Sequence, residues 1–405
     1  MTLLGAFLIG YPQVMALVWM ALALIYLIRS ESSQRWLTQP PDTAAEPISV
    51  LIPCFNEGAN LADTLNAALQ LDWPDLEVIA INDGSADDTG AQLEEWAQLD
   101  PRLRVVHLHR NQGKAVALQA GALLARHELL LCIDGDALLD PQAAAWLVHR
   151  FQLDHKLGAV TGNPRIRNRT TLLGRIQVGE FSSIVGLIKR AQSQLGGLFT
   201  VSGVVTAFRR SALHSVGYWS VDMLTEDIAI TWKLQRAGWH VAYEPHALVW
   251  ILMPETLGGL WKQRLRWAKG GVQVLLANAD LLLHPAQWRL LPLLLEPLLS
   301  LLWAQAMAVS LLIWLVFGLH GNVPLMPQAS GFSLVLICLL QFGFSLWLDH
   351  PYDKHLRGTF YWMIWYPLFF WLLTMATAVV ALPQVLFRRR GQRARWVSPD
   401  RGVRV

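Results

Sequence analysis

Two aspartates separated by one glycine end a short apolar run in the segment ELLLCIDGDALLDP. Asp134 and Asp136 lie two positions apart, so on an extended segment both side chains point the same way. Gly135 lets a ligand come close to the backbone. A hard divalent cation that completes its shell with substrate phosphates suits this pair. Asp-Gly is also common in turns, and a turn is the alternative interpretation of the motif taken alone.

Two further polar residues follow other apolar runs. Asp83 begins the stretch DGSADDT after LEVIAIN, and its carboxylate can accept hydrogen bonds from a nucleobase or a ribose. Within the same stretch, Ser85, Asp87 and Asp88 are typical caps of a following helix. Lys114 follows a glycine at a predicted helix start, where we expect contact with a diphosphate. The alternatives are a capped turn for the first stretch and a solvated lysine for the second.

Two acids also occupy the first turn of a predicted helix in MLTEDIAITWKLQRAGWHV. Thr225 is a suitable N-cap, Glu226 and Asp227 follow it, and Gly238 ends the helix. Acids in a first turn are usually explained by the helix dipole, so this segment alone does not establish a site.

A basic and aromatic cluster occurs in LWKQRLRWAKGG, just before the C-terminal apolar segments; it comprises Gln263, Arg264, Arg266, Trp267 and Lys269. The cluster can be a juxtamembrane anchor, with basic residues at lipid headgroups and the tryptophan in the interface. It can also be functional, with arginines neutralising a diphosphate and Trp267 stacking on a sugar face. A site at a membrane surface would use the same residues for both.

The elements that must position these residues alternate between strand and helix. ISVLIP, LEVIAIN, LRVVHL and ELLLCID read as buried strands, and helical patterns separate them. This alternation predicts an α/β domain with a mostly parallel sheet covered by helices, in which ligands bind beyond the carboxyl ends of the strands. No GxGxxG follows the first strand and no GxxxxGK[ST] occurs, which disfavours a dinucleotide fold and a P-loop.

The composition indicates a membrane protein. Hydrophobic residues make up 53% and charged residues 16% of the 405 residues. Four apolar runs are each close to the roughly 20 residues that a bilayer-spanning helix needs, and they are Gly5 to Ile28, Leu293 to Leu319, Gly331 to Leu348 and Phe360 to Phe387. The net charge of +3 does not imply nucleic acid. The three cysteines show neither a disulfide framework nor a zinc-site spacing.

The positions of basic residues predict the orientation. Arg29 and Arg35 follow the first run and no basic residue precedes it, so the globular domain is expected in the cytoplasm. The basic tail FRRRGQRARW is expected there too, whereas three crossings after the domain would place it outside. One of the three runs therefore lies in the interface, re-enters or fails to span. Gly331 to Leu348 is the weakest, and the number of crossings stays open.

The motifs together resemble a family. Asp83, Asp134-Gly135-Asp136, Thr225-Glu226-Asp227 and Gln263-Arg264-Leu265-Arg266-Trp267 occur in the order and approximate spacing of the membrane-integrated family 2 glycosyltransferases. That family includes cellulose, hyaluronan, chitin and poly-N-acetylglucosamine synthases. The segments FTVSGVVTAFRRSAL, ILMPETLGGLWKQRLRWAKGG and QRARWVSPDRG are most similar to the branch that polymerises N-acetylglucosamine. The resemblance implies a GT-A (Rossmann-like) cytosolic domain with transmembrane and interfacial helices.

The resemblance also implies a role for each motif. Asp83 would hold the uridine, and Asp134 would contact UDP. Asp136 would coordinate Mg2+ or Mn2+, and Asp227 would be the general base with Glu226 beside it. Gln263, Arg266 and Trp267 would close over the diphosphate and the acceptor sugar. Lys114 and Arg264 complete the residues expected to bind the substrate or UDP.

The implied activity is processive, inverting polymerisation of N-acetylglucosamine from UDP-GlcNAc into poly-β-1,6-N-acetyl-D-glucosamine. The implied location is the bacterial inner membrane, multi-pass, with the polymer passing through for a biofilm matrix. A small membrane partner subunit, with cyclic di-GMP at the shared interface, is implied as well. The alternatives are another synthase specificity, transfer of a single sugar to a lipid carrier, and a catalytically inactive nucleotide-binding scaffold.

The expected organisation has five parts along the chain. They are an N-terminal anchor (1–30), a linker (31–46), the cytosolic glycosyltransferase domain (47–272), interfacial and transmembrane helices (273–388) and a basic cytosolic tail (389–405).

Overall fold

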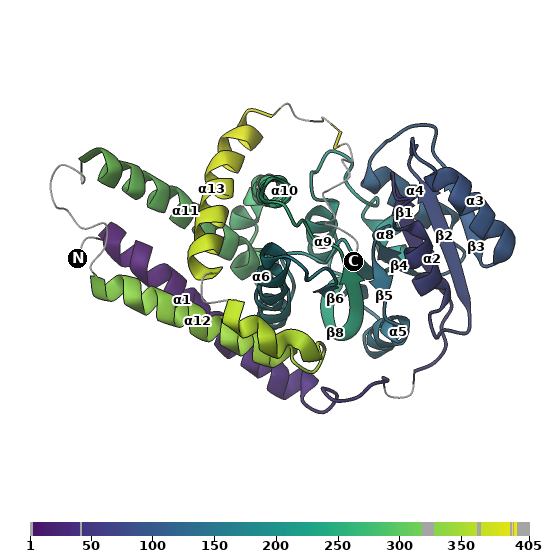
Figure 1. The fold of residues 1–405 in the computed structure, drawn as a ribbon, viewed down its shortest axis with the longest axis horizontal. Helices are drawn as coiled ribbons and strands as arrows, with labels where there is room; N and C mark the ends of the chain where they lie inside the picture. The colour runs from purple at the N-terminus through teal and green to yellow at the C-terminus, as the bar shows by residue number, and fades with distance from the viewer. Residues whose placement is uncertain are drawn as a thin grey trace. The chain divides into compact units, whose positions relative to one another are not determined.

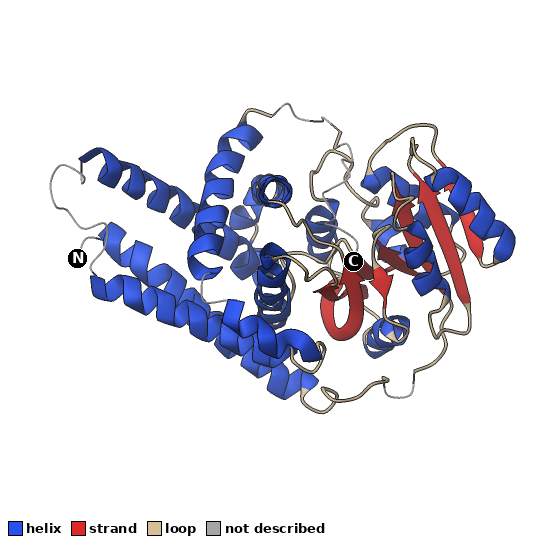
Figure 2. Ribbon diagram, viewed as in Figure 1, coloured by secondary structure: helices blue, strands red, loops and turns tan. Residues whose placement is uncertain are grey.

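The computed structural model describes residues 3–40, 43–317, 328–362, 366–388, 391 and 393–394. The chain divides into two compact units. The sheet unit comprises the described residues within 31–168, 197–253 and 389–405, and the helical unit those within 1–30, 169–196 and 254–388. Figure 2 shows the strands in the sheet unit, whereas the helical unit is built from helices. Residues 169–196 and 254–272, which the sequence analysis places in the globular domain, group with the apolar helices.

The described residues of the sheet unit form an eight-stranded sheet of order β3-β2-β1-β4-β7-β6-β8-β5. The strands are β1 (Ile48–Cys54), β2 (Leu76–Asn82), β3 (Leu103–His107), β4 (Leu129–Ile133), β5 (Leu138–Leu139), β6 (Leu157–Ile166), β7 (Val205–Arg209) and β8 (His240–Ile251). Strands β3, β2, β1 and β4 are parallel neighbours, as the alternating pattern predicts. The sheet changes direction at β7, which lies antiparallel between β4 and β6.

Helices connect these strands: α2 (Leu61–Leu69), α3 (Thr89–Leu99), α4 (Lys114–Leu124), α5 (Ala143–Leu153), α8 (Arg210–Ser215) and α9 (Glu226–Arg236) (Figure 1). The first three each follow a parallel strand, so their first turns lie at the carboxyl ends of β1, β2 and β3. This edge carries the polar residues that are predicted to form the site.

The capping predicted before α3 is partly wrong. Asp87 does cap, because its Oδ1 accepts hydrogen bonds from the Thr89 N–H at 3.1 Å and the Thr89 hydroxyl at 2.6 Å. The Ser85 hydroxyl instead accepts from the Asn56 N–H at 3.0 Å. Asp88 is the N-cap residue without a side-chain capping bond, and its Oδ2 accepts from the Gln92 side chain.

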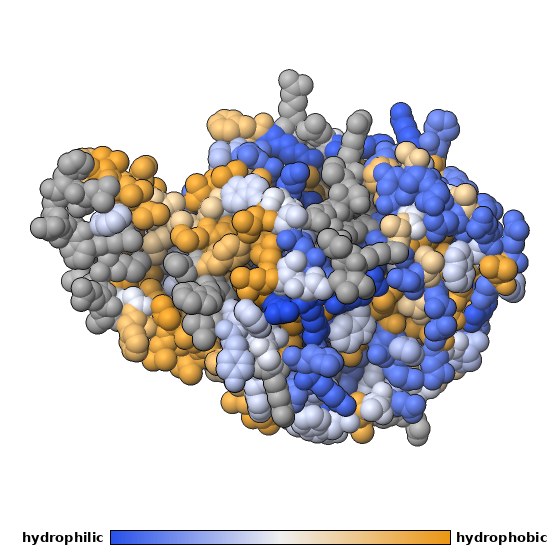
Figure 3. Space-filling view, viewed as in Figure 1, coloured by the Kyte–Doolittle hydropathy of each residue, from blue (hydrophilic) through white to orange (hydrophobic). Residues whose placement is uncertain are grey.

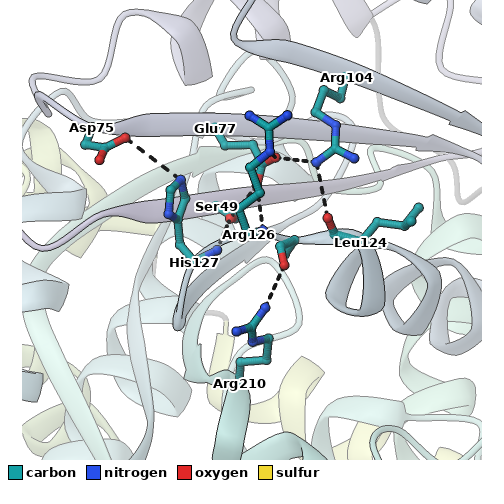
Figure 4. Close-up of polar contacts among 9 residues, drawn as sticks. Ser49, Asp75, Glu77, Arg104, Leu124, Arg126, His127 and Arg210 are labelled. Atoms are coloured by element: carbon teal, nitrogen blue, oxygen red, sulfur yellow. Dashed lines mark hydrogen bonds and ion pairs between the residues drawn. The ribbon is translucent and has the colours of Figure 1, made fainter.

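The opposite edge of the sheet holds a buried acid that organises the strand starts (Figure 4). Glu77 accepts hydrogen bonds from the Ser49 hydroxyl at 2.7 Å and the Arg126 N–H at 3.1 Å, and it pairs with the Arg104 guanidinium. Burial alone would raise the pKa of Glu77, but these donors hold that pKa below its ordinary value. The cluster therefore ties together the starts of β1, β2, β3 and β4.

The helical unit carries the apolar runs. Its helices are α1 (Leu3–Tyr26), α6 (Leu172–Phe181), α7 (Ile188–Ser193), α10 (Leu257–Ala277), α11 (Leu291–Phe317), α12 (Gln328–Asp349) and α13 (Tyr366–Leu386). Short π and 3-10 turns complete it: η1 (Leu27–Glu31), η2 (Ser182–Leu187), η3 (Ala279–Leu283), η4 (Pro285–Leu290) and η6 (Lys354–Trp362). Figure 3 shows hydrophobic side chains gathered over α1, α11 and α12, whereas the visible face of the sheet unit is largely hydrophilic.

Four described helical segments are long and apolar enough to cross a membrane: Leu3–Glu31, Pro285–Phe317, Gly331–Asp349 and Phe369–Leu386. They overlap the four predicted runs, although the second segment begins at Pro285 and not at Leu293. The fourth run differs as well. The fourth run was expected from Phe360, but Lys354–Trp362 forms a 3-10 turn and α13 begins at Tyr366. Residues 318 and 319 of the second run, 363–365 of the fourth run and most of the basic tail lie outside the described residues.

A buried ion pair fixes the end of α12 within the helical unit. Arg190 Nη1 lies 2.7 Å from Asp349 Oδ1, and both side chains are fully buried. The same guanidinium donates to the Gly186 carbonyl and lies over the Tyr352 ring at 5.5 Å. A side chain at position 186 would collide with the Asp349 carboxylate, so the glycine in η2 permits this approach.

Candidate active site

The carboxyl ends of β2 and β4 bring two of the predicted acids to one edge of the sheet. Asp83 directly follows β2, and Asp134 directly follows β4. Strand β1 lies between them and is parallel to both, so the ends of β2 and β4 point the same way. The strand order therefore assembles at one edge residues that are far apart along the chain.

Asp83 is fully buried and holds the loop that leads into α4. Its Oδ1 accepts from the Gln112 N–H and its Oδ2 from the Gly113 N–H, both at 2.8 Å. Burial raises the pKa of Asp83, and these two donors oppose that rise. The carboxylate of Asp83 thus fixes the backbone just before Lys114. A uridine would have to bind to the lone pairs of this carboxylate that remain.

Lys114 begins α4 and joins acids from two distant segments. Its Nζ lies 2.5 Å from Asp134 Oδ1 and 3.2 Å from Glu226 Oε1, and it donates to the Gly203 carbonyl at 2.8 Å. Burial alone would lower the pKa of Lys114, but the carboxylates of Asp134 and Glu226 hold that pKa above its ordinary value. The lysine is therefore a charged member of the cluster, and the alternative of a solvated lysine is wrong.

Asp136 is buried beside Asp134, and the charges of Lys114 and Arg167 offset only part of the cost of ionising it. Only 7% of Asp136 is exposed. Burial and the neighbouring Asp134 carboxylate raise the pKa of Asp136 to about 7. A divalent cation would relieve this repulsion, so the donor set fits a hard cation held by one or two carboxylates. The described residues contain no group of three or more His, Cys, Asp or Glu side chains placed to hold a metal, so phosphates and water would complete the shell.

Gly135 fits because no side chain has room at this position. A Cβ added there would lie 2.9 Å from Glu57 Cγ and 3.2 Å from the Pro53 carbonyl oxygen. The Gly135 carbonyl accepts a hydrogen bond from the Thr64 hydroxyl at 2.9 Å. The backbone between the two aspartates is therefore held against β1 and α2.

The first turn of α9 presents Glu226 and Asp227 to the same cluster. Asp227 Oδ1 accepts from its neighbouring Ile228 N–H at 2.9 Å, as expected for an acid at a helix start. A Cβ added to Gly203 would lie 3.2 Å from both Asp227 Oδ2 and Lys114 Nζ. Thr225 is the N-cap, although its side chain makes no capping bond.

The predicted residues of the basic and aromatic cluster lie on α10 in the helical unit, as their own group. Arg264 is buried, and its Nη2 lies 3.0 Å from Glu180 Oε2. Its guanidinium also stacks over the Trp267 ring at 4.2 Å and contacts the Gln263 side chain at 3.2 Å. Arg266 is exposed. The structure therefore gives Arg264 an internal ion pair, which differs from its expected contact with UDP.

Comparison with known proteins identifies the family. The family model described as "Glycosyltransferase like family 2" matches residues 45–270. The chain belongs to glycosyltransferase family 2. This transferase is 39% identical over 404 residues to a poly-β-1,6-N-acetyl-D-glucosamine synthase of Staphylococcus epidermidis, with 98% of each chain covered. It is also 39% identical over 405 residues to the synthase of the same name from Staphylococcus aureus (strain COL), again over 98% of each chain.

A solved structure confirms the fold class of this glycosyltransferase. The mannosyltransferase PcManGT from Pyrobaculum calidifontis, in complex with GDP-Man and Mn2+, superposes with a TM-score of 0.63 at 22% sequence identity. The match covers 95% of this chain and 99% of that chain. The mixed, mostly parallel sheet of the family 2 enzyme is therefore a GT-A fold, as the resemblance implies.

Several residues of this glycosyltransferase's cluster were not predicted from the sequence. Gly203 supplies the carbonyl that Lys114 contacts, and no motif marks it. Ala394, in the C-terminal tail, donates its N–H to the Val221 carbonyl at 3.0 Å. A Cβ added to Gly113, whose φ is +95°, would lie 2.5 Å from the Ala394 carbonyl oxygen. Ala394 therefore lies beside Gly113, whereas the sequence predicted only that the basic tail lies in the cytoplasm.

Proposed function

We propose that this glycosyltransferase transfers N-acetylglucosamine from UDP-GlcNAc onto the 6-hydroxyl of a growing poly-β-1,6-N-acetyl-D-glucosamine chain, with inversion at the anomeric carbon. Relatives of that name, 39% identical over 98% of the chain, support the substrate and the linkage. The observation that carries the chemistry is the cluster in which one lysine joins the acid after β4 to the acids of α9.

In this proposal the residues after β2 and β4 hold the donor. Asp136, with Asp134 beside it, holds Mg2+ or Mn2+, and Asp83 orients the loop at the uridine. The bound cation supplies electrostatic stabilisation of the charge that develops on departing UDP. Lys114 adds a second positive charge next to the diphosphate.

Asp227 is the general base of the proposed reaction. It accepts the proton of the acceptor's 6-hydroxyl as that oxygen forms a bond to the anomeric carbon and the bond from that carbon to UDP breaks. A placed base contributes about 10²–10⁴-fold to such a step. Its position in the first turn of α9 supports this role, because the helix dipole favours the ionised carboxylate. Gln263, Arg266 and Trp267 are proposed to contact the diphosphate and the acceptor sugar.

We propose that the enzyme works at the inner membrane with the sheet unit in the cytoplasm. The four apolar helical segments and the basic residues that follow the first of them support this location. Translocation of the polymer, a small membrane partner subunit and a response to cyclic di-GMP at their interface stay predictions from the family resemblance.

The decisive experiment is product analysis. The purified full chain, reconstituted in lipid, is incubated with UDP-GlcNAc and Mg2+, and the product is digested with hydrolases specific for β-1,6, β-1,4 and β-1,3 linkages. A long polymer cleaved by the β-1,6 hydrolase supports the proposal. A polymer of another linkage indicates a different synthase, a single glycolipid indicates transfer to a lipid carrier, and absence of transfer with retained UDP binding indicates an inactive scaffold.

A further inference from the structure

A small cavity lies beside Asp227 inside the sheet unit. Its volume is about 10 Å³, which is room for one group about the size of a water molecule. Besides Asp227, its wall includes Leu118, Cys132, Val201, Phe208 and Trp219. These five are at most 4% exposed and form the apolar side of the cavity. Beside Asp227, the wall is completed by Ser202, Gly203, Thr206 and Glu226, of which all but Thr206 are half-buried.

The apolar side of the wall is formed by packed core side chains. Cys132 of β4 stands opposite Thr206 of β7 in the antiparallel register, and Leu118 reaches the cavity from α4. Phe208 and Trp219 meet edge to face with ring centroids 5.4 Å apart. A methyl group loses nothing by lying against this apolar side, whereas a polar group there would lose its hydrogen bonds to water unless it reached the polar residues on the other side.

The chemistry of the proposed reaction places one such methyl group nearby. A general base must lie about 2.6–3.2 Å from the attacking oxygen, and that oxygen lies about 3–3.5 Å from the anomeric carbon. The next carbon of the donor sugar carries the N-acetyl group. In a donor that is positioned for attack, the acetamido group is therefore only a few bonds away from the anomeric carbon, and the attacking oxygen next to that carbon contacts Asp227.

We infer that this cavity receives the methyl group of the donor's N-acetyl substituent, and that Leu118, Cys132 and Trp219 determine the preference for an N-acetylated sugar. The inference rests on the proposed function, which it deepens by naming the residues that select the donor. In a pocket of this kind, one carbon more or less changes the specificity by roughly 10–200-fold.

The test enlarges or fills the cavity and compares donors. The purified full chain transfers from UDP-GlcNAc, UDP-glucose or UDP-N-propionylglucosamine to one β-1,6-linked N-acetylglucosamine oligosaccharide, so only the donor changes. Cys132→Ala removes the sulfur and is expected to raise kcat/KM for the N-propionyl donor, relative to UDP-GlcNAc, by about tenfold. Leu118→Val widens the cavity from another element and should act in the same direction. Cys132→Val fills it and should lower the preference for UDP-GlcNAc over UDP-glucose about tenfold.

Cys54→Ala is the matched control, because Cys54 is equally buried in the neighbouring strand β1 and does not line the cavity. Its donor preference should equal that of the unmodified enzyme. Unchanged donor preferences in all three cavity variants, with transfer from UDP-GlcNAc intact, would overturn the inference and leave the proposed function standing. An equal shift in Cys54→Ala would also overturn it, since general loosening of the sheet would explain the result. If the unmodified enzyme transfers nothing from UDP-GlcNAc, the proposed function fails, and the inference with it.

Discussion

The ammonium of Lys114 lies 2.5 Å from Asp134 and 3.2 Å from Glu226, so one cation joins the acids after β4 to the acids of α9. The first group is proposed to hold the donor, and the second adjoins the proposed base. Each group alone has an ordinary explanation, in a turn or in a helix start. Their convergence on a buried lysine favours a common site.

Replacement of Lys114 should lower turnover strongly. Lys114→Met leaves Asp134 and Glu226 without their shared cation and removes a positive charge from the diphosphate, and we expect kcat to fall about 10²–10³-fold. Transfer from radiolabelled UDP-GlcNAc measures the effect. Lys156→Met, at an exposed lysine of the same unit, is the control and should keep its activity. Near-normal turnover in Lys114→Met would show that Lys114 does not contribute to catalysis.

Replacement of Asp227 should separate binding from chemistry. Asp227→Asn keeps the shape of the side chain but cannot accept the proton, so kcat should fall about 10²–10⁴-fold. Binding of UDP, followed by calorimetry, should change little, because the donor contacts are elsewhere. Asp75→Asn is a matched change at the opposite edge, where 62% of the Asp75 side chain is exposed. Substantial polymer from Asp227→Asn would assign the base to another residue.

Removal of divalent cations should stop transfer. The buried Asp134–Asp136 pair is expected to bind donor phosphates only through a cation, so EDTA should abolish UDP release and added Mg2+ or Mn2+ should restore it. In Asp136→Asn, the metal concentration for half-maximal rate should rise by at least about tenfold. Full activity in excess chelator would exclude Asp136 as a metal ligand in the reaction.

Arg264 and Arg266 should behave differently although they are two residues apart. Arg264→Ala leaves Glu180 buried without its partner, which typically costs about 3–5 kcal/mol, so the melting temperature in detergent should fall. Glu180→Ala should lower it similarly. Arg266→Ala, at an exposed position, should leave the melting temperature unchanged and reduce transfer. If Arg264→Ala loses activity but keeps its melting temperature, Arg264 contacts the donor, as the sequence predicts, and the ion pair with Glu180 is not its main role.

Loss of Glu77 should destabilise the sheet unit without touching the site. Glu77→Ala removes an acceptor shared by Ser49, Arg104 and Arg126, and we expect a loss of about 1–3 kcal/mol in the free energy of unfolding. Urea unfolding followed by circular dichroism measures it, with Glu95→Ala, at an exposed position of α3, as the control. An equal effect of both changes would contradict the role given to the cluster.

The same residue predicts a pH dependence. The pKa of Glu77 is lower in the folded protein than its ordinary value of 4.5. Its contribution to stability is therefore fully present above pH 4.5 and is lost as the pH falls through the folded pKa. The difference in stability between the unmodified protein and Glu77→Ala should shrink below pH 4.5, and a difference that stays constant there would argue against the shift.

The sequence predicts the strand ends well because buried parallel strands have a clear sequence pattern, namely a short apolar run that stops at polar residues. The positions of Asp83, Lys114 and Asp134 follow from that pattern and from the strand order. The ion pair of Arg264 does not, because its partner Glu180 lies on another helix and neither spacing nor composition links the two. The antiparallel strand β7 was missed for a similar reason, since its five residues follow a glycine-containing loop without a clear periodic pattern.

The change of strand direction at β7 has an evolutionary consequence. The acids proposed to hold the donor follow the parallel strands, whereas Gly203 and the acids of α9 belong to the stretch that enters and leaves the antiparallel strand. Gly203 and Glu226 both contact Lys114, which also contacts Asp134. A substitution in the later stretch therefore also changes the surroundings of the acids that follow the parallel strands. The two stretches are therefore expected to change together during evolution, although they lie far apart along the gene.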